Sequence, residues 1–172
     1  MLAARAGDRA ATGAAIADLK RASDSLRAPE LALDFGQTIQ AQAAWRQRRP
    51  AEVIAALDSG WLKGQRWLSE TVFGAHDYER YLRAEAFRAL GRDEEALRWY
   101  ASLGPGSSDI AYAAPAHLRQ AQVYEKLGQR AQAARHYEQF IRLWEACDPA
   151  FRPMVDSARQ RFAQLRPGAA AR

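Results

Sequence analysis

The sequence predicts an all-α protein, an α-solenoid of about three antiparallel helix pairs followed by a C-terminal capping helix. Three observations lead to this fold class. The chain of 172 residues contains 38 Ala, the residue of highest helix propensity, and few β-branched residues. Apolar residues recur at helical spacing in several segments. One pattern around a Leu-Gly pair occurs twice, as RALGRDEEALRWY (88–100) and EKLGQRAQAARHY (125–137).

The repeated pattern predicts a helix, a tight turn and a second helix. Gly91 and Gly128 each follow a Leu that ends an apolar face, and Gly suits the left-handed conformation of a helix C-cap. Ala96 and Ala133 are expected where the two helices of a pair cross, because a larger side chain would push the helices apart. The pairs of matching residues are Leu90 and Leu127, Gly91 and Gly128, Ala96 and Ala133, Arg98 and Arg135, Tyr100 and Tyr137.

The remaining elements follow from periodicity and from helix-breaking residues. Pro50 and Pro115 fit the first turn of a helix, and GPGSS at 104–108 is expected to be a turn. Residues 59–76 show no sustained period and are expected to form an insertion loop, and the tail 166–172 is expected to fray. In the last helix, Phe162 and Leu165 are expected inward and Arg161 toward water. We predict helices at about 8–26, 29–47, 50–58, 77–90, 92–102, 114–127, 129–146 and 153–165.

The two clear copies, at 77–103 and 114–146, resemble the tetratricopeptide repeat. Small and aromatic residues precede the turn Gly, and Ala and an aromatic residue follow it, as in that family. Arg80 and His117 stand where the family has Trp, which is a departure from its pattern. The residues that carry the resemblance are Ala84, Phe87, Gly91, Ala96 and Tyr100 in one copy, and Ala121, Tyr124, Gly128, Ala133 and Tyr137 in the other.

Two weaker copies precede these repeats within a single predicted domain, 1–165. Residues 29–58 fit the same frame, with Arg48 at the turn. Residues 1–28 fit it in part: Gly7 holds the turn position, Thr12 the small position and Ile16 the apolar position. The segment 1–28 is therefore either a partial repeat, from an array cut at its N-terminus, or a plain N-terminal helix.

Residues 77–165 are also similar to the C-terminal ends of bacterial serine/threonine kinases and transcriptional activators that carry such repeats. This resemblance implies a non-catalytic docking or sensor segment that binds a protein or peptide. In the repeat family the first helices line a concave groove, and the Asn place of its carboxylate clamp holds Glu85 and Gln122 here, so no such clamp is expected. The groove residues that the frame implies are Phe35, Gln42, Trp45, Tyr78, Tyr81, Glu85, Arg88, Leu118, Gln122 and Glu125.

Two alternatives remain open for the aromatic residues. Tyrosines at helical spacing also occur in helical cores, so the groove aromatics are either ligand contacts or core residues. Trp61, Trp67 and Phe73 in the insertion either bind a partner or fold back to seal a gap between two pairs.

Other function classes find little support in the sequence. The single cysteine, Cys147, permits no internal disulfide, and no His has a partner at metal-binding spacing, so we expect no metal, cofactor or catalytic residue. The net charge of +5 suggests an acidic or nucleic-acid partner, or merely Arg-rich solvated faces. An RNA-binding helical repeat is the alternative function. No signal peptide or membrane segment is recognised, which predicts a cytoplasmic protein, and self-association stays open.

Overall fold

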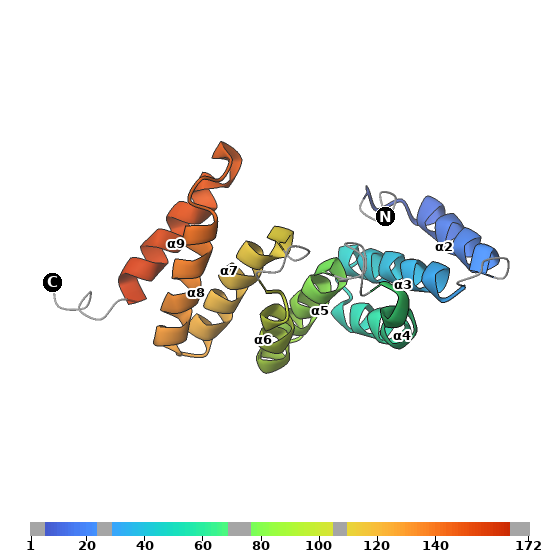
Figure 1. Ribbon diagram of the computed structural model, residues 1–172, viewed down its shortest axis with the longest axis horizontal. Coiled ribbons are helices and arrows are strands. Elements are labelled where there is room, and N and C mark those ends of the chain that lie inside the picture. The colour runs from blue at the N-terminus through green and yellow to red at the C-terminus, as the bar shows by residue number, and fades with distance from the viewer. Residues whose placement is uncertain (1–5, 24–28, 69–76, 105–109, 166–172) are drawn as a thin grey trace. The chain divides into compact units, whose positions relative to one another are not determined.

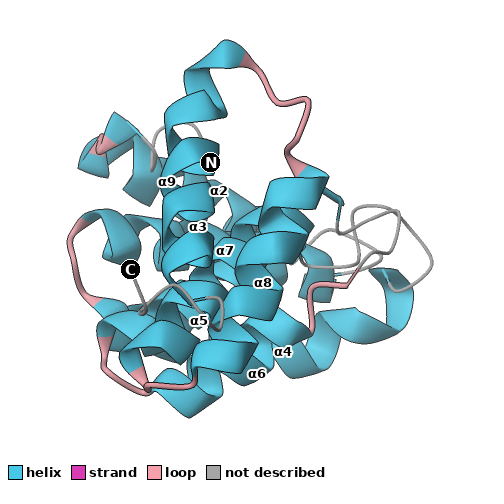
Figure 2. Cartoon of the chain, turned by 90° about the vertical axis from the view of Figure 1, so that its left-hand side faces the viewer, coloured by secondary structure: helices cyan, strands magenta, loops and turns pink. Residues whose placement is uncertain are grey.

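The computed structural model describes residues 6–23, 29–68, 77–104 and 110–165, without the side chains of 29–31, 60–68 and 110. These residues are helical apart from short turns and contain no strand, which confirms the all-α class (Figures 1 and 2). The elements are α2 (Arg9–Ser23), α3 (Pro29–Arg46), α4 (Pro50–Leu68), α5 (Asp77–Ala89), α6 (Asp93–Ala101), α7 (Ile110–Lys126), α8 (Arg130–Leu143), the 3-10 turn η1 (Pro149–Phe151) and α9 (Arg152–Leu165).

The chain divides into two compact units, Met1–Ala96 and Leu97–Arg172. In the first unit α2 packs on α3, α3 on α4, and α4 on α5. Figure 1 shows α3 and α4 side by side as a pair. Burial of small and branched apolar side chains between these helices stabilises the unit. The core of this unit consists of Ala41, Ala44, Val53, Leu57, Leu82 and Ala86, with Trp45, Ile54, Ala56 and Tyr78 packed around it.

In the second unit α7 packs on α8, and α8 packs on α9. Phe140 is fully buried, and Phe162 packs against the core while Leu165 is buried in it, as the sequence predicts for the last helix. Cys147 is partly buried against the same core as a free thiol. The core of this unit consists of Ala114, Leu118, Ala121, Ala133, Tyr137, Phe140, Val155, Ala158 and Leu165.

Four turns share one backbone conformation. Gly7, Gly91 and Gly128 have φ of 80°, 73° and 71°, and Arg48 has φ of 58°. The amide that follows each of the last three turn residues donates to the carbonyl five residues back, as in the Schellman motif. These bonds join Arg49 N to Ala44 O at 3.0 Å, Arg92 N to Phe87 O at 2.9 Å, and Gln129 N to Tyr124 O at 2.8 Å.

The predicted turn positions are therefore confirmed, including Arg48, where no glycine marks the turn. The residue five positions after each turn is buried in all four copies: Thr12 is 5% exposed, and Val53, Ala96 and Ala133 are each 0% exposed. Ala96 and Ala133, the small residues that the sequence places at this position, are thus fully buried.

Two elements differ from the prediction. The helix that begins at Pro50, as predicted, runs to Leu68 and includes ten residues assigned to the insertion loop, while 69–76 lie outside the described residues. Gly60 and Gly64 obscure the period there, but each Gly costs only about 1 kcal/mol in a helix interior.

Pro115 is not in a first turn, because α7 begins at Ile110 and Pro115 is its sixth residue. Proline has no amide hydrogen to donate to the carbonyl one turn back, so α7 lacks one internal hydrogen bond. The Ala-rich sequence around Pro115 favours a continuous helix despite this loss.

Candidate partner-binding site

The predicted groove residues of the first unit differ in accessibility. Phe35 on α3 is 47% exposed, whereas Gln42 on the same helix is 6% exposed. Trp45 packs against the core at the end of α3 and lines a hollow with Arg46 and Arg48. Of these groove positions, Phe35 and Trp45 offer contact surface and Gln42 offers little.

On α5 the predicted positions are largely occupied by contacts within the unit. Glu85 is 6% exposed and accepts a hydrogen bond from Arg88 at 2.9 Å. Tyr78 packs against the core, and Tyr81 is partly buried. This helix therefore presents less free surface than the repeat frame implies.

In the second unit, three predicted residues from α7 line one hollow of about 380 Å³: Leu118, Gln122 and Glu125. A volume of this order suits one or two side chains of a ligand. The other lining residues come from α8 and α9, and the groove prediction did not include them: Tyr137, Met154, Ser157, Ala158 and Arg161.

Glu125 is the centre of a polar cluster at one end of this hollow. The Tyr137 hydroxyl donates to Glu125 Oε2 at 2.9 Å, and the Arg161 guanidinium forms an ion pair with Glu125. Burial, reinforced by the Glu125 carboxylate, raises the pKa of Tyr137 to about 12. The hydrogen bond from Arg161 to Glu125 raises the pKa of that guanidinium. At neutral pH the cluster therefore combines a neutral phenol with the ion pair of Glu125 and Arg161.

Apolar side chains form the rest of the hollow. Leu118 and Ala158 are 7% and 2% exposed, while Met154 is 43% exposed. The arrangement can accept an apolar side chain beside Met154 and a polar group at Glu125 and Arg161.

A second cluster in this unit joins α7 to α8. Nδ1 of His117 lies 3.0 Å from Nδ1 of His136, and Tyr124 stacks on the His136 ring at 5.3 Å between centroids. Burial, with the charges of His117 and Arg135, lowers the pKa of His136 to about 4. Burial and Arg142 lower the pKa of His117. These histidines are nineteen residues apart, so sequence spacing alone could not reveal the pair.

Within the described ranges, no three or more His, Cys, Asp or Glu residues are grouped to hold a metal ion. In the same ranges, no helix has both the length and the apolar character that a bilayer span requires. The chain matches no protein-family model, and no curated protein or solved structure gives a significant match.

Proposed function

We propose that the chain is a tetratricopeptide-like α-solenoid that serves as a protein–protein interaction module without catalytic activity. In this proposal it is a docking or sensor segment of a bacterial signalling or regulatory protein. The observation that carries the proposal is the recurrence of a turn residue with positive φ at Gly7, Arg48, Gly91 and Gly128, each followed five residues later by a buried residue. Helix pairs repeated in this way stack on their neighbours, and such arrays use the surface of successive first helices for binding.

The hollow between α7, α8 and α9 is the proposed contact site. Leu118 supplies an apolar floor, and Met154 stands exposed at the hollow. Met, Tyr and Arg are enriched in the centres of protein interfaces. The most suitable ligand is a peptide segment that places one apolar side chain in the hollow and a polar group against Glu125 or Arg161.

Site-specific crosslinking tests this proposal. A photoreactive amino acid replaces Gln122 or Met154 in the hollow, and a control carries it at Glu138, which is exposed on α8 and does not line the hollow. In cells of the source organism, we expect the variants at Gln122 and Met154 to form discrete crosslinked adducts with a partner protein. The variant at Glu138 should form none of these adducts. Absence of adducts from the hollow, or the same adducts from Glu138, would contradict the proposal.

A further inference from the structure

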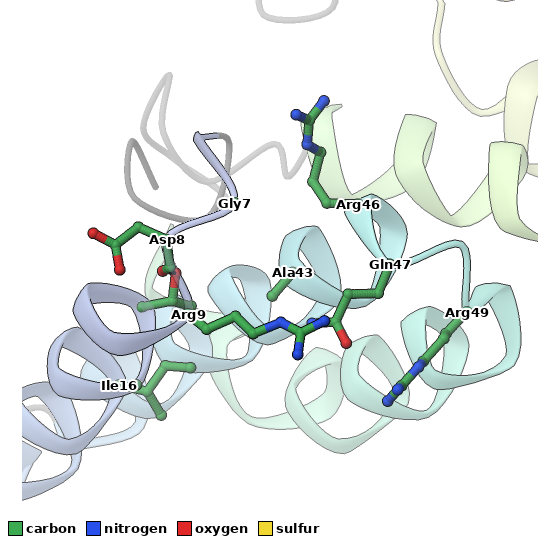
Figure 3. A pocket seen from close by; sticks show the side chains of 10 residues that line it. Gly7, Asp8, Arg9, Ile16, Ala43, Arg46, Gln47 and Arg49 are labelled. Carbon is green, nitrogen blue, oxygen red and sulfur yellow. Dashed lines mark hydrogen bonds between the residues drawn. The ribbon is translucent and has the colours of Figure 1, made fainter.

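Another hollow, of about 540 Å³, lies in the first unit between α2, α3 and the turn that follows α3 (Figure 3). Its lining combines apolar side chains with arginines from both helices and the turn. The residues that line it are Gly7, Asp8, Arg9, Thr12, Gly13, Ile16, Ala43, Arg46, Gln47 and Arg49.

Ile16 provides an apolar surface that its equivalents in the other copies do not. Nine residues after the turn, Leu57, Tyr100 and Tyr137 are 5%, 0% and 2% exposed. Ile16 holds the same position but is only partly buried, and it lines this hollow and two adjoining ones. The described part of the chain therefore leaves apolar surface on α2 open to a ligand.

The charges around the hollow favour an anion. The side chains of Arg9 and Arg46 make no hydrogen bond or ion pair with any residue in the described ranges, and Arg49 forms an exposed ion pair with Glu52 at 3.3 Å. The carboxylate in the lining, Asp8, accepts a hydrogen bond from the Ala11 amide at 2.9 Å. The lining thus contains three arginines and one acid, and that acid already accepts a hydrogen bond.

The geometry defines where an anion would lie. In Figure 3 the Arg9 side chain extends from α2 toward Gln47, while Arg46 and Arg49 point outward on either side. In this view Ile16 on α2 and Ala43 on the facing α3 lie on opposite sides of the Arg9 side chain. A carboxylate between Arg9 and Gln47 would gain a charge-assisted hydrogen bond, and an adjacent apolar side chain would cover Ile16.

We propose that this hollow is a second docking site, which binds an acidic peptide segment of a protein partner with an apolar residue next to an Asp or Glu. Charge complementarity with the arginines of the lining and the open surface of Ile16 support this ligand. A polynucleotide would match the arginines but not the apolar Ile16 and Ala43. This inference does not depend on the function proposed for the hollow at α7–α9.

The test is selection of displayed random dodecapeptides on three forms of the full chain: wild type, Arg9→Glu/Arg46→Glu, and Arg135→Glu/Arg152→Glu. The third form carries the same change in net charge at exposed positions of the other unit. We expect wild type and the third form to enrich peptides with Asp or Glu beside an apolar residue. The strongest such peptide should bind Arg9→Glu/Arg46→Glu at least about tenfold more weakly, which corresponds to about 1.4 kcal/mol.

Circular dichroism of each form verifies its folding, and Arg9→Gln/Arg46→Gln provides a second variant without reversed charge. That variant should also lose affinity for the acidic peptide. Selection without acidic enrichment would overturn the proposal, as would an equal loss of affinity in the control form. If a random-sequence RNA binds tightly and competes with the peptide at Arg9 and Arg46, the ligand of this hollow is a nucleic acid and the proposal of a peptide ligand is wrong.

Discussion

Replacement of Gly91 by Ala isolates the energetic role of the turn in the repeated pattern. Gly91 has φ of +73°, and a Cβ added there would meet no atom within 4 Å. The substitution therefore introduces no steric clash with the rest of the fold. Its effect on the free energy of unfolding comes from backbone conformation alone.

The magnitude follows from two opposing contributions. An L-residue in the left-handed region costs about 1–2 kcal/mol, while Ala also reduces the entropy of the unfolded chain, which favours folding by about 0.4–1 kcal/mol. The net expectation for Gly91→Ala is a destabilisation of about 1 kcal/mol. Arg48→Gly should show the reverse, because Arg48 adopts φ of 58° without being glycine.

Gly13 provides the matched control in the same unit. It lies inside α2, has no positive φ, and a Cβ there also meets nothing within 4 Å. Gly13→Ala should therefore stabilise the chain by about 0.5–1 kcal/mol. Urea unfolding followed by far-UV circular dichroism measures all three variants. A neutral or stabilising Gly91→Ala would refute the assignment of Gly91 to a left-handed turn.

Three further predictions concern the second unit. Because burial lowers the pKa of His117, and lowers the pKa of His136 to about 4, the stability contributed by the neutral rings is complete above pH 6.5 and is lost as pH falls through these lowered pKa values. Discounted for partial exposure of the rings, the loss in the free energy of unfolding is about 1–2 kcal/mol. This loss should be smaller in His136→Phe. If urea unfolding of His136→Phe shows the same pH dependence as the wild type, the prediction is wrong. Tyr137→Phe should cost about 1 kcal/mol in the same assay, because it removes the bond to Glu125, and no loss would mean that this bond does not form. Ala133→Met should cost about 1–3 kcal/mol by overpacking a fully buried site, whereas a neutral result would indicate loose helix packing there.

The sequence predicted the turns accurately because their chemistry is local. A glycine after an apolar helix end favours the left-handed C-cap, so Gly91 and Gly128 could be placed without tertiary information. Arg48 lacks that signal and was located only by the repeat frame. The frame succeeded because the buried position five residues later, occupied by Val53, keeps its place relative to the turn.

The helix boundaries were less predictable, since local signals there conflict with context. Pro115 and Gly60 are residues that usually limit helices, yet both lie inside one in this structure. Their costs of about 1–3 kcal/mol are small enough for the helix-favouring residues and packing around them to offset.

The contacts of the hollow at α7–α9 could be predicted only in part from the sequence. The contact that could not be predicted determines which residues contribute to the affinity for a ligand. Residues on α7 follow from the repeat frame, and Arg161 is exposed as expected, but its pairing with Glu125 joins residues 36 positions apart. No local pattern encodes that contact. Since Glu125 is already paired, a ligand must replace Arg161 or bind without the carboxylate, and exchange of one exposed ion pair for another changes the free energy little. The affinity of this hollow should therefore come mainly from apolar contact with Leu118 and Met154, in contrast to the arginine-rich hollow beside α2.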